Sequence, residues 1–413
     1  MCTLGRMAGK KREEPKEDDV SVPKFAREML SLTERLHDTA TERDVANNRQ
    51  LFYDQVCTLI LIYYFNPVVS SLRAIEQASG LKKVQRMLGC GRASLGSLSE
   101  AMRVFDADLL LPIIGELSGQ LKPLVKDARL NEIRKTITLV DGSLLKALPL
   151  MAEASLLTHE TGKGSVKWRL HTQFDLLKGV PDQIEPTRDN GKENDERAVL
   201  SRFLEGGKCY VGDRGYLKTA LFNQIHNSDS NYVIRIKDKT TYDVIENREL
   251  SSEAKELRVV SDQIIEINSQ SGPDHKTRLI VIEKKAHSKH HSYKKTGPAC
   301  DGFLRILTDM IDVPAEIIAI LYEHRWQVEI FFRYFKNLLG CRHLLARNEN
   351  GIKIQVYCGI IACLLISLWT GRKPTLRTHE MICYYLTGLA DEDELIAHLE
   401  SLKKAEALKQ AKK

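Results

Sequence analysis

Residues 318–339 read IAILYEHRWQVEIFFRYFKNLL, and this stretch decides how the rest of the chain is interpreted. At about 100° per residue, four polar side chains share a stripe about 60° wide on a helical wheel: Tyr322, Arg325, Glu329 and Lys336. An apolar stripe lies beside them, formed by Leu321, Val328, Phe331, Phe335, Leu338 and Leu339. The pattern predicts one helix that packs on a core and presents its polar stripe to an anionic partner. The simplest alternative is a solvated face with an Arg325–Glu329 ion pair at i,i+4.

The composition is that of a globular protein. The chain has 413 residues, 43% hydrophobic and 28% charged, which is long enough for two or three domains. Its net charge of +6 permits nucleic-acid binding without requiring it. Nine cysteines form no CxxC pair, which indicates reduced thiols rather than disulfides or a zinc site. The apolar run 354–369 is interrupted and shorter than the roughly 20 residues of a membrane span, so we expect a buried core helix.

The N-terminal third is predicted to be a charged tail followed by helices. Residues 1–22 are polar and charged, which predicts a disordered tail without a secretory signal. Residues 23–130 have helical periodicity, and their short helices break at glycines. Basic residues alternate with apolar ones there, which favours a helical DNA-binding module over an ordinary helical bundle: Arg73, Lys82, Lys83, Arg86 and Arg92.

Strands replace helices after Arg134. Residues 136–140 (TITLV) form a short β-branched run that ends at Asp141, and residues 208–212 (KCYVG) run into Asp213. Further strands are predicted at 166–176, 179–188 and 231–237, with helices at 193–204 and after Asp213 to residue 226. This order predicts an α/β fold in which two short strands each end in an aspartate.

Residues 240–308 are rich in strands, and residues 371–413 are predicted to be helical. The loop 284–295, KKAHSKHHSYKK, contains three histidines. Its lysines would repel a metal cation, so a loop that reaches a phosphate backbone is the better interpretation.

Three carboxylates therefore stand out: Asp141, Asp213 and Glu329. Carboxylates gathered at neighbouring strand ends repel each other unless a cation lies among them, although single aspartates at strand ends often only cap turns. Oxygen ligands of this kind suit Mg²⁺ or Mn²⁺. Two such ions would activate a water or a 3′-hydroxyl and stabilise the leaving oxygen of a phosphoryl transfer. Arg325 and Lys336 would then hold phosphates beside the metals.

These motifs together resemble those of the DDE transposases of bacterial insertion sequences, in particular the insertion-sequence-four group. The signature of that group is Y-(2)-R-(3)-E-(6)-K, matched here by Tyr322, Arg325, Glu329 and Lys336, with LVDGS around Asp141 and VGDRGY around Asp213. The resemblance implies an RNase H-like catalytic core at 131–239 and 309–370, interrupted by a mostly β insertion at 240–308. A helical DNA-binding domain (23–130) would precede the core, and C-terminal helices (371–413) would follow it.

The resemblance also implies an activity. Family members cleave DNA at transposon ends, often through a hairpin, and join the 3′ ends to target DNA. Asp141, Asp213 and Glu329 would bind Mg²⁺ or Mn²⁺, and Tyr322, Arg325 and Lys336 would contact terminal phosphates. Trp326 would stack on a displaced base, and further DNA contacts are expected from Arg214, Arg235 and Lys237. In that role the Arg325–Glu329 pair is not expected to serve as a helix staple.

The expected partners are double-stranded DNA, at the terminal inverted repeats and at the target, and a second copy of the chain as a homodimer on DNA. No membrane is expected, and the protein is expected in the bacterial cytoplasm at the nucleoid. Two alternatives remain open. One is a DNA-binding protein derived from a transposase that has lost catalysis, and the other is a structure-specific nuclease with an RNase H fold.

Overall fold

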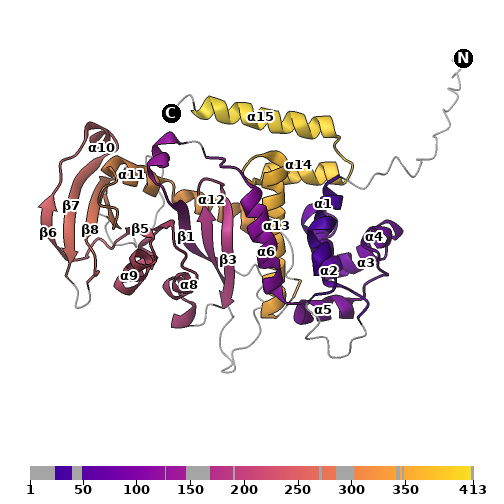
Figure 1. The fold of residues 1–413 in the computed structure, drawn as a ribbon. Coiled ribbons are helices and arrows are strands. Elements are labelled where there is room, and N and C mark those ends of the chain that lie inside the picture. Colours follow the sequence, from indigo (N-terminus) through magenta and orange to yellow (C-terminus); the bar gives the residue numbers. More distant parts are fainter. Residues whose placement is uncertain are drawn as a thin grey trace, which may run out of the picture.

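The computed structural model describes residues 24–39, 49–125, 127–145, 168–188, 191–268, 272–284, 302–340, 345–346 and 348–410. Within these ranges, nine strands form one mixed sheet in the order β3-β2-β1-β4-β5-β9-β8-β7-β6 (Figure 1). The strands are β1 (Thr136–Leu145), β2 (Trp168–Asp175), β3 (Val180–Arg188), β4 (Lys208–Gly212), β5 (Asn231–Arg235), β6 (Tyr242–Asn247), β7 (Val259–Ile267), β8 (Thr277–Glu283) and β9 (Phe303–Thr308). The large mixed sheet with helices on its faces is the predicted α/β class. The predicted 1–22 tail and most of the 284–295 loop lie outside the described residues.

The first half of the sheet is built around β1. This strand pairs antiparallel with β2 and parallel with β4, and β5 continues the parallel set. Pairing with β4 ends at Leu139↔Val211, whereas pairing with β2 continues to Leu145↔Trp168. The prediction that the strand ends before Asp141 is therefore wrong, because β2 keeps supplying hydrogen-bond partners after β4 has stopped.

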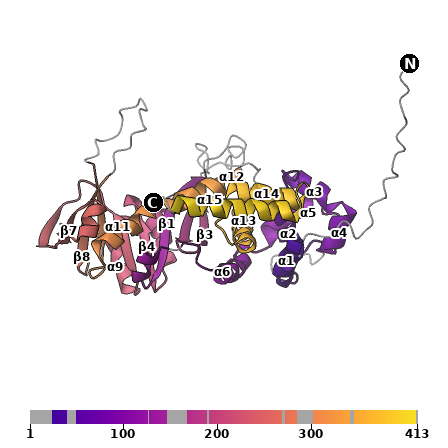
Figure 2. The same cartoon turned by 90° about the horizontal axis from the view of Figure 1, so that it is seen from above.

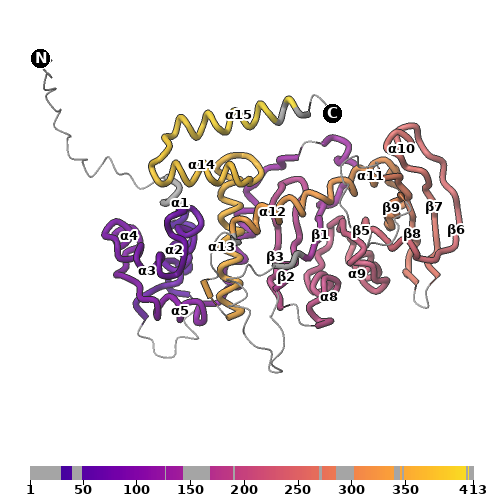
Figure 3. The backbone as a smooth tube through the Cα atoms, turned by 180° about the vertical axis from the view of Figure 1, so that it is seen from behind, coloured from indigo at the N-terminus to yellow at the C-terminus, as the bar shows by residue number. Residues whose placement is uncertain are grey.

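The strands at 240–308 extend the same sheet. β9 pairs antiparallel with β5, and β8, β7 and β6 follow in antiparallel order. A short helix, α10 (Ser252–Glu256), connects β6 to β7. Figure 3 shows these strands at one end of the molecule and the N-terminal helices at the other.

Helices cover both faces of the sheet. On one face, α8 (Glu196–Arg202) and α9 (Thr219–Asn227) pack against an apolar cluster that contains Val140 and Tyr210. On the other face, α12 (Trp326–Gly340) contacts β1 and α13 (Glu349–Thr370) contacts β3. Successive residues of a strand point to opposite faces, so Leu139 belongs to the α12 side and Val140 to the α8 side.

Residues 318–339 form two helices instead of the single helix that was predicted. Helix α11 (Ala315–Glu323) ends before a turn at His324 and Arg325, and α12 begins at Trp326. In this turn the amides of Arg325 and Gln327 bond to carbonyls three residues back, at 3.1 and 2.9 Å, as in a 3₁₀ turn. Periodicity alone does not reveal such a break, since the apolar stripe continues through it.

Helix α13 joins the N-terminal helices to the sheet. These helices are α1 (Lys24–Thr33), α2 (Tyr53–Phe65), α3 (Leu72–Ser79), α4 (Lys82–Leu88), α5 (Leu95–Val104) and α6 (Leu111–Gln120). One apolar cluster runs from α2 through α13 to β1 and β2, and the Tyr64 hydroxyl donates to the Gln355 carbonyl at 2.8 Å. Whether residues 23–130 form a DNA-binding domain stays a prediction.

By length and composition α13 could cross a membrane, but 89% of its most apolar window is buried inside the fold. The prediction of a buried core helix at 354–369 is therefore confirmed. Beyond it, α14 (Leu376–Leu386) and α15 (Glu392–Gln410) lie over the other elements in the view from above (Figure 2).

Candidate active site

The two predicted aspartates lie at the same edge of the sheet. Asp213 directly follows β4, and Asp141 lies on β1 just past the last residue that pairs with β4. Because β1 and β4 are parallel, their carboxyl ends meet at this edge. The Asp213 Oδ1 also accepts the Gly215 amide at 2.7 Å, so this aspartate caps a 3₁₀ turn, η6 (Arg214–Tyr216), as well.

Glu329 is brought to this edge by α12. Asp141 points to the α12 face, since it alternates with Leu139 along β1, and Glu329 lies in the first turn of the helix that packs there. The pKa of Asp141 shows how close the acids are. Burial raises this pKa to about 6, with a further contribution from the Asp213 charge and a smaller one from Glu329, while Arg325 opposes the shift. The three carboxylates selected from sequence are therefore neighbours.

Arg325 lies among these acids. Its guanidinium is 8% exposed and donates through Nη2 to Glu329 Oε1 at 2.7 Å. The structure thus forms the ion pair that was not expected as a staple. Because Arg325 precedes α12, the pair ties the turn to the first turn of that helix. The guanidinium also lies over the rings of Tyr322 and Trp326, at 5.9 and 5.1 Å from their centroids.

The aromatic residues of the signature differ in exposure. Tyr322 is buried, and its pKa is raised by burial while Arg325 and Arg235 oppose the shift. Its hydroxyl therefore faces the same edge of the sheet. Trp326 is 59% exposed, so it is not the core-packing residue that a helical tryptophan usually is. Its ring is accessible for stacking.

The remaining predicted DNA contacts are distributed around the site. Arg235 ends β5, next to β4, with Asp238 at 3.7 Å. Arg214 and Lys237 are exposed, and Lys336 is half-buried with its Nζ 5.8 Å from the Phe332 ring centroid. Arg214 comes directly after Asp213 and Arg235 is the last residue of β5, whereas Lys336 lies two turns beyond Glu329 along α12.

Sequence reasoning missed a fourth carboxylate. Glu196, the first residue of α8, contributes to raising the pKa of Asp141, and its own pKa is raised by burial and by Asp213, against the influence of Arg169. Arg169 of β2 forms an ion pair with it. Acids are common in the first turn of a helix, so nothing in the sequence distinguished Glu196 from an ordinary end residue.

The site fits a divalent cation. Its donors are carboxylate oxygens, which suit Mg²⁺ or Mn²⁺, and the pKa of Asp141 is raised first by burial and then by the neighbouring Asp213 charge. Another group of possible ligands among the described residues, His226, His275 and Asp309, lies near the opposite edge. There His226 Nδ1 lies 2.9 Å from Asp309 Oδ2 and the Tyr232 hydroxyl 3.0 Å from His275 Nε2, so hydrogen bonds already engage these atoms.

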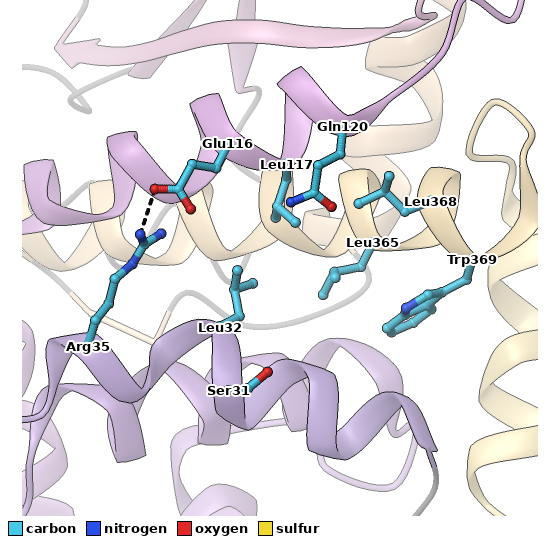
Figure 4. Close-up of a pocket in the computed structure, with 9 residues that line it drawn as sticks. All are labelled: Ser31, Leu32, Arg35, Glu116, Leu117, Gln120, Leu365, Leu368 and Trp369. Atoms are coloured by element: carbon cyan, nitrogen blue, oxygen red, sulfur yellow. Dashed lines mark hydrogen bonds and ion pairs between the residues drawn. The ribbon is translucent and has the colours of Figure 1, made fainter.

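A cavity of about 570 Å³ lies away from this chemistry, between α1, α6 and α13 (Figure 4). It is lined by Leu32, Leu117, Leu365 and Trp369 with an Arg35–Glu116 ion pair at 2.6 Å. None of the four clustered carboxylates contributes to it.

Comparison with known proteins identifies the family. Residues 132–365, more than half of the chain, match the family described as "Transposase DDE domain". The chain belongs to this family. The matched segment begins four residues before β1 and ends inside α13, so it contains both aspartates and Glu329.

Individual relatives carry the same description. The chain is 25% identical over 257 residues to the "Putative transposase y4zB" of Sinorhizobium fredii, covering 62% of this chain and 65% of the relative. It is 26% identical over 223 residues to the "Probable transposase for insertion sequence element IS5377" of Geobacillus stearothermophilus, covering 51% of this chain and 54% of the relative. The chain thus spans less than two thirds of the length of these relatives.

A solved piggyBac transposase synaptic complex with hairpin DNA aligns over 91% of this chain and 84% of its own. The TM-score is 0.38 and the identity 9%, values at which the likeness carries no argument.

Proposed function

We propose that this chain is a DDE transposase of the YREK subgroup that cuts DNA at transposon ends and joins the 3′ ends to target DNA. The observation that carries the proposal is the meeting of Asp141, Asp213 and Glu329, which come from two parallel strands and from a helix more than 100 residues further along the chain. The spacing of Glu329 to Tyr322, Arg325 and Lys336 is that of the signature. Family membership supports the same reaction class.

The proposed catalytic domain is an RNase H-like core. The half-sheet β3-β2-β1-β4-β5 supports this, with three antiparallel strands followed by two that are parallel to β1. Strands β6–β9 would be the insertion, added at the edge of β5.

Asp141, Asp213 and Glu329 would hold Mg²⁺ or Mn²⁺. When bound, such ions activate the attacking water or 3′-hydroxyl and stabilise the leaving oxygen. The side chains of this site would position the ions, and their oxygen-only donor set favours hard divalent cations over softer metal ions. With the acids neutralised, the Arg325 guanidinium can bind a phosphate of the cleaved strand instead of only Glu329.

The DNA would lie along the edge that carries the acids. Lys336, Arg235, Arg214 and Lys237 would bind phosphates, the Tyr322 hydroxyl would contact the terminal phosphate, and the exposed Trp326 ring would stack on an unpaired base if a hairpin forms. The helices of residues 23–130 would bind the terminal inverted repeat. Two copies of the chain would bring two ends together.

The test uses the full chain, Mg²⁺, DNA that carries the inverted repeats flanking the gene, and a supercoiled target plasmid. We expect the wild-type protein to cut at the ends and to join them to the target, and Asp213→Ala to abolish both steps while end binding is retained. The control is Asp243→Ala, an exposed aspartate of β6. Cleavage without joining would support the nuclease alternative, and binding without cleavage the catalytically silent one.

A further inference from the structure

Glu196 reaches the site from the face of the sheet opposite to Glu329. It is the first residue of α8, which packs on the same apolar cluster as Val140, whereas Asp141 points to the α12 side. Asp195 caps this helix by accepting the amides of Arg197 and Ala198 at 3.0 and 2.8 Å. The cap fixes the start of α8, and therefore the direction in which the Glu196 side chain leaves it.

Two glycines leave the space that the Glu196 side chain occupies. A Cβ on Gly142, the residue after Asp141, would overlap Glu196 Cγ. A Cβ on Gly215 would lie 2.7 Å from Glu196 Oε2 and 2.9 Å from Asp213 Oδ1. The carboxylates of Glu196 and Asp213 therefore both lie next to Gly215. A side chain at Gly142 or Gly215 would force Glu196 away from the aspartates.

Arg169 orients this carboxylate. Its Nη1 donates to Glu196 Oε1, and the two side chains are only 21% and 22% exposed. The other oxygen, Oε2, is the one that faces Gly215 and Asp213. Because Arg169 binds Oε1 of Glu196 and leaves Oε2 directed toward the site, Arg169 acts as a positioning residue.

We propose that Glu196 is a fourth carboxylate of the metal site, that it binds the divalent cation together with Asp213, and that Arg169 positions it. This inference rests on the proposed function, since it assumes that the site holds a metal.

A purely structural role is the competing explanation. The Arg169–Glu196 pair could simply tie α8 to β2, with the acid favoured by the helix N-terminus. Such a role does not require Glu196 to border Asp213, and a fourth negative charge beside three others is unfavourable unless a cation compensates it. Arg169 and Arg325 offset two of the four charges, which leaves an excess that suits a divalent ion.

The test measures Mn²⁺ binding to the full-length protein without DNA, by the loss of the electron paramagnetic resonance signal of free Mn²⁺. We expect Glu196→Gln to weaken the affinity by roughly tenfold or more. The matched control, Glu193→Gln, removes the same charge from an exposed position three residues earlier and should leave the affinity unchanged. Asp213→Asn serves as the positive control and should also weaken binding.

Circular dichroism and thermal unfolding in EDTA show whether each variant is folded. If Glu196→Gln does not fold, Glu196→Asp replaces it: the charge is kept but withdrawn by about 1.5 Å, and an intermediate affinity is expected. Wild-type affinity in a folded Glu196 variant, with Asp213→Asn weakened, overturns the role of Glu196 and leaves the proposed function standing. No Mn²⁺ binding by the wild-type protein overturns the metal site itself, and the proposed function with it.

Discussion

Asp141 is the residue at which the electrostatics of the site are most visible. Its carboxyl is half-buried beside the charges of Asp213, Glu329 and Glu196, and its pKa is raised to about 6. In the metal-free protein, an ionised Asp141 therefore destabilises the fold. The raised pKa means that the folded state binds this proton more tightly than the unfolded chain does. Protonation of Asp141 therefore stabilises the folded state. This stabilisation is fully present below the pKa of Asp141 in the unfolded chain, near 3.9, and is lost as the pH rises through about 6.

Asp141→Asn is expected to stabilise the metal-free protein at pH 7.5. A shift of about 2 pKa units corresponds to roughly 3 kcal/mol, and the gain should shrink as the pH falls toward 5, where Asp141 in the folded wild-type protein is mostly protonated. Urea unfolding in EDTA at both pH values measures it, with exposed Asp243→Asn as the control. A variant that is no more stable than the wild type at pH 7.5 would contradict this description of the site.

At this scale the sequence predicted some residues and missed others for physical reasons. Asp213 follows a short apolar strand and is flanked by a turn, so its place at the sheet edge could be predicted. The place of Glu196 beside Asp213 could not be, because it depends on the space left by two glycines, Gly142 and Gly215, that are distant from it in sequence. Trp326 was correctly separated from the apolar stripe, but only the structure shows that its ring is exposed.

At the scale of elements, a buried arginine anchors the segment that leads from β9 to α11. Arg278 of β8 is 2% exposed and bonds Asp262 of β7 through two nitrogens, at 2.8 and 2.7 Å. It also donates to the Met310 carbonyl at 3.0 Å, in the segment that leads from β9 to α11. Strands β7 and β8 therefore anchor the segment that leads into α11, the helix that precedes the Arg325 turn and α12 with its Glu329.

Arg278→Met is expected to destabilise the protein by about 3–5 kcal/mol, because it leaves Asp262 buried without its partner. Adding Asp262→Leu should restore much of this loss, since the second change removes the unpaired charge. The control is Arg103→Gln, which breaks an exposed pair with Glu100 and should change stability by less than about 0.5 kcal/mol. The free energies of unfolding are measured by urea denaturation. A loss below about 1 kcal/mol for Arg278→Met would contradict this role of the Arg278–Asp262 pair.

The sequence predicted the order of the helices and strands better than it predicted the residues at which they begin and end. Strands β4 and β5 lie within a residue or two of their predicted ranges, because each is a compact, mainly apolar run. The extension of β1 past Asp141 was not predicted, because it depends on pairing with β2, which is distant in sequence. The turn at His324 and Arg325 was not predicted either, because the apolar stripe continues through it.

At the scale of the whole molecule, the segments that composition separates share one sheet and one apolar core. The segment 240–308 joins the core sheet through β9, and the N-terminal helices share one apolar cluster with α13 and β1. Composition shifts mark these segments in the sequence, but sheet pairing and shared cores are long-range contacts that local patterns do not encode. The consequence is that three distant stretches, around residues 141, 213 and 329, lie at one edge.

If these three stretches form a single metal site, iron-directed backbone cleavage detects it most directly. With added hydrogen peroxide and ascorbate, Fe²⁺ that replaces Mg²⁺ reduces the peroxide to hydroxyl radicals, which cut the polypeptide next to the bound ion. The full-length protein should be cut near residues 141, 213 and 329 together, with all three cuts suppressed by excess Mg²⁺ and absent from Asp213→Asn. Cuts at only one of these stretches, or cuts that Mg²⁺ and the Asp213 substitution leave unchanged, would contradict a shared site.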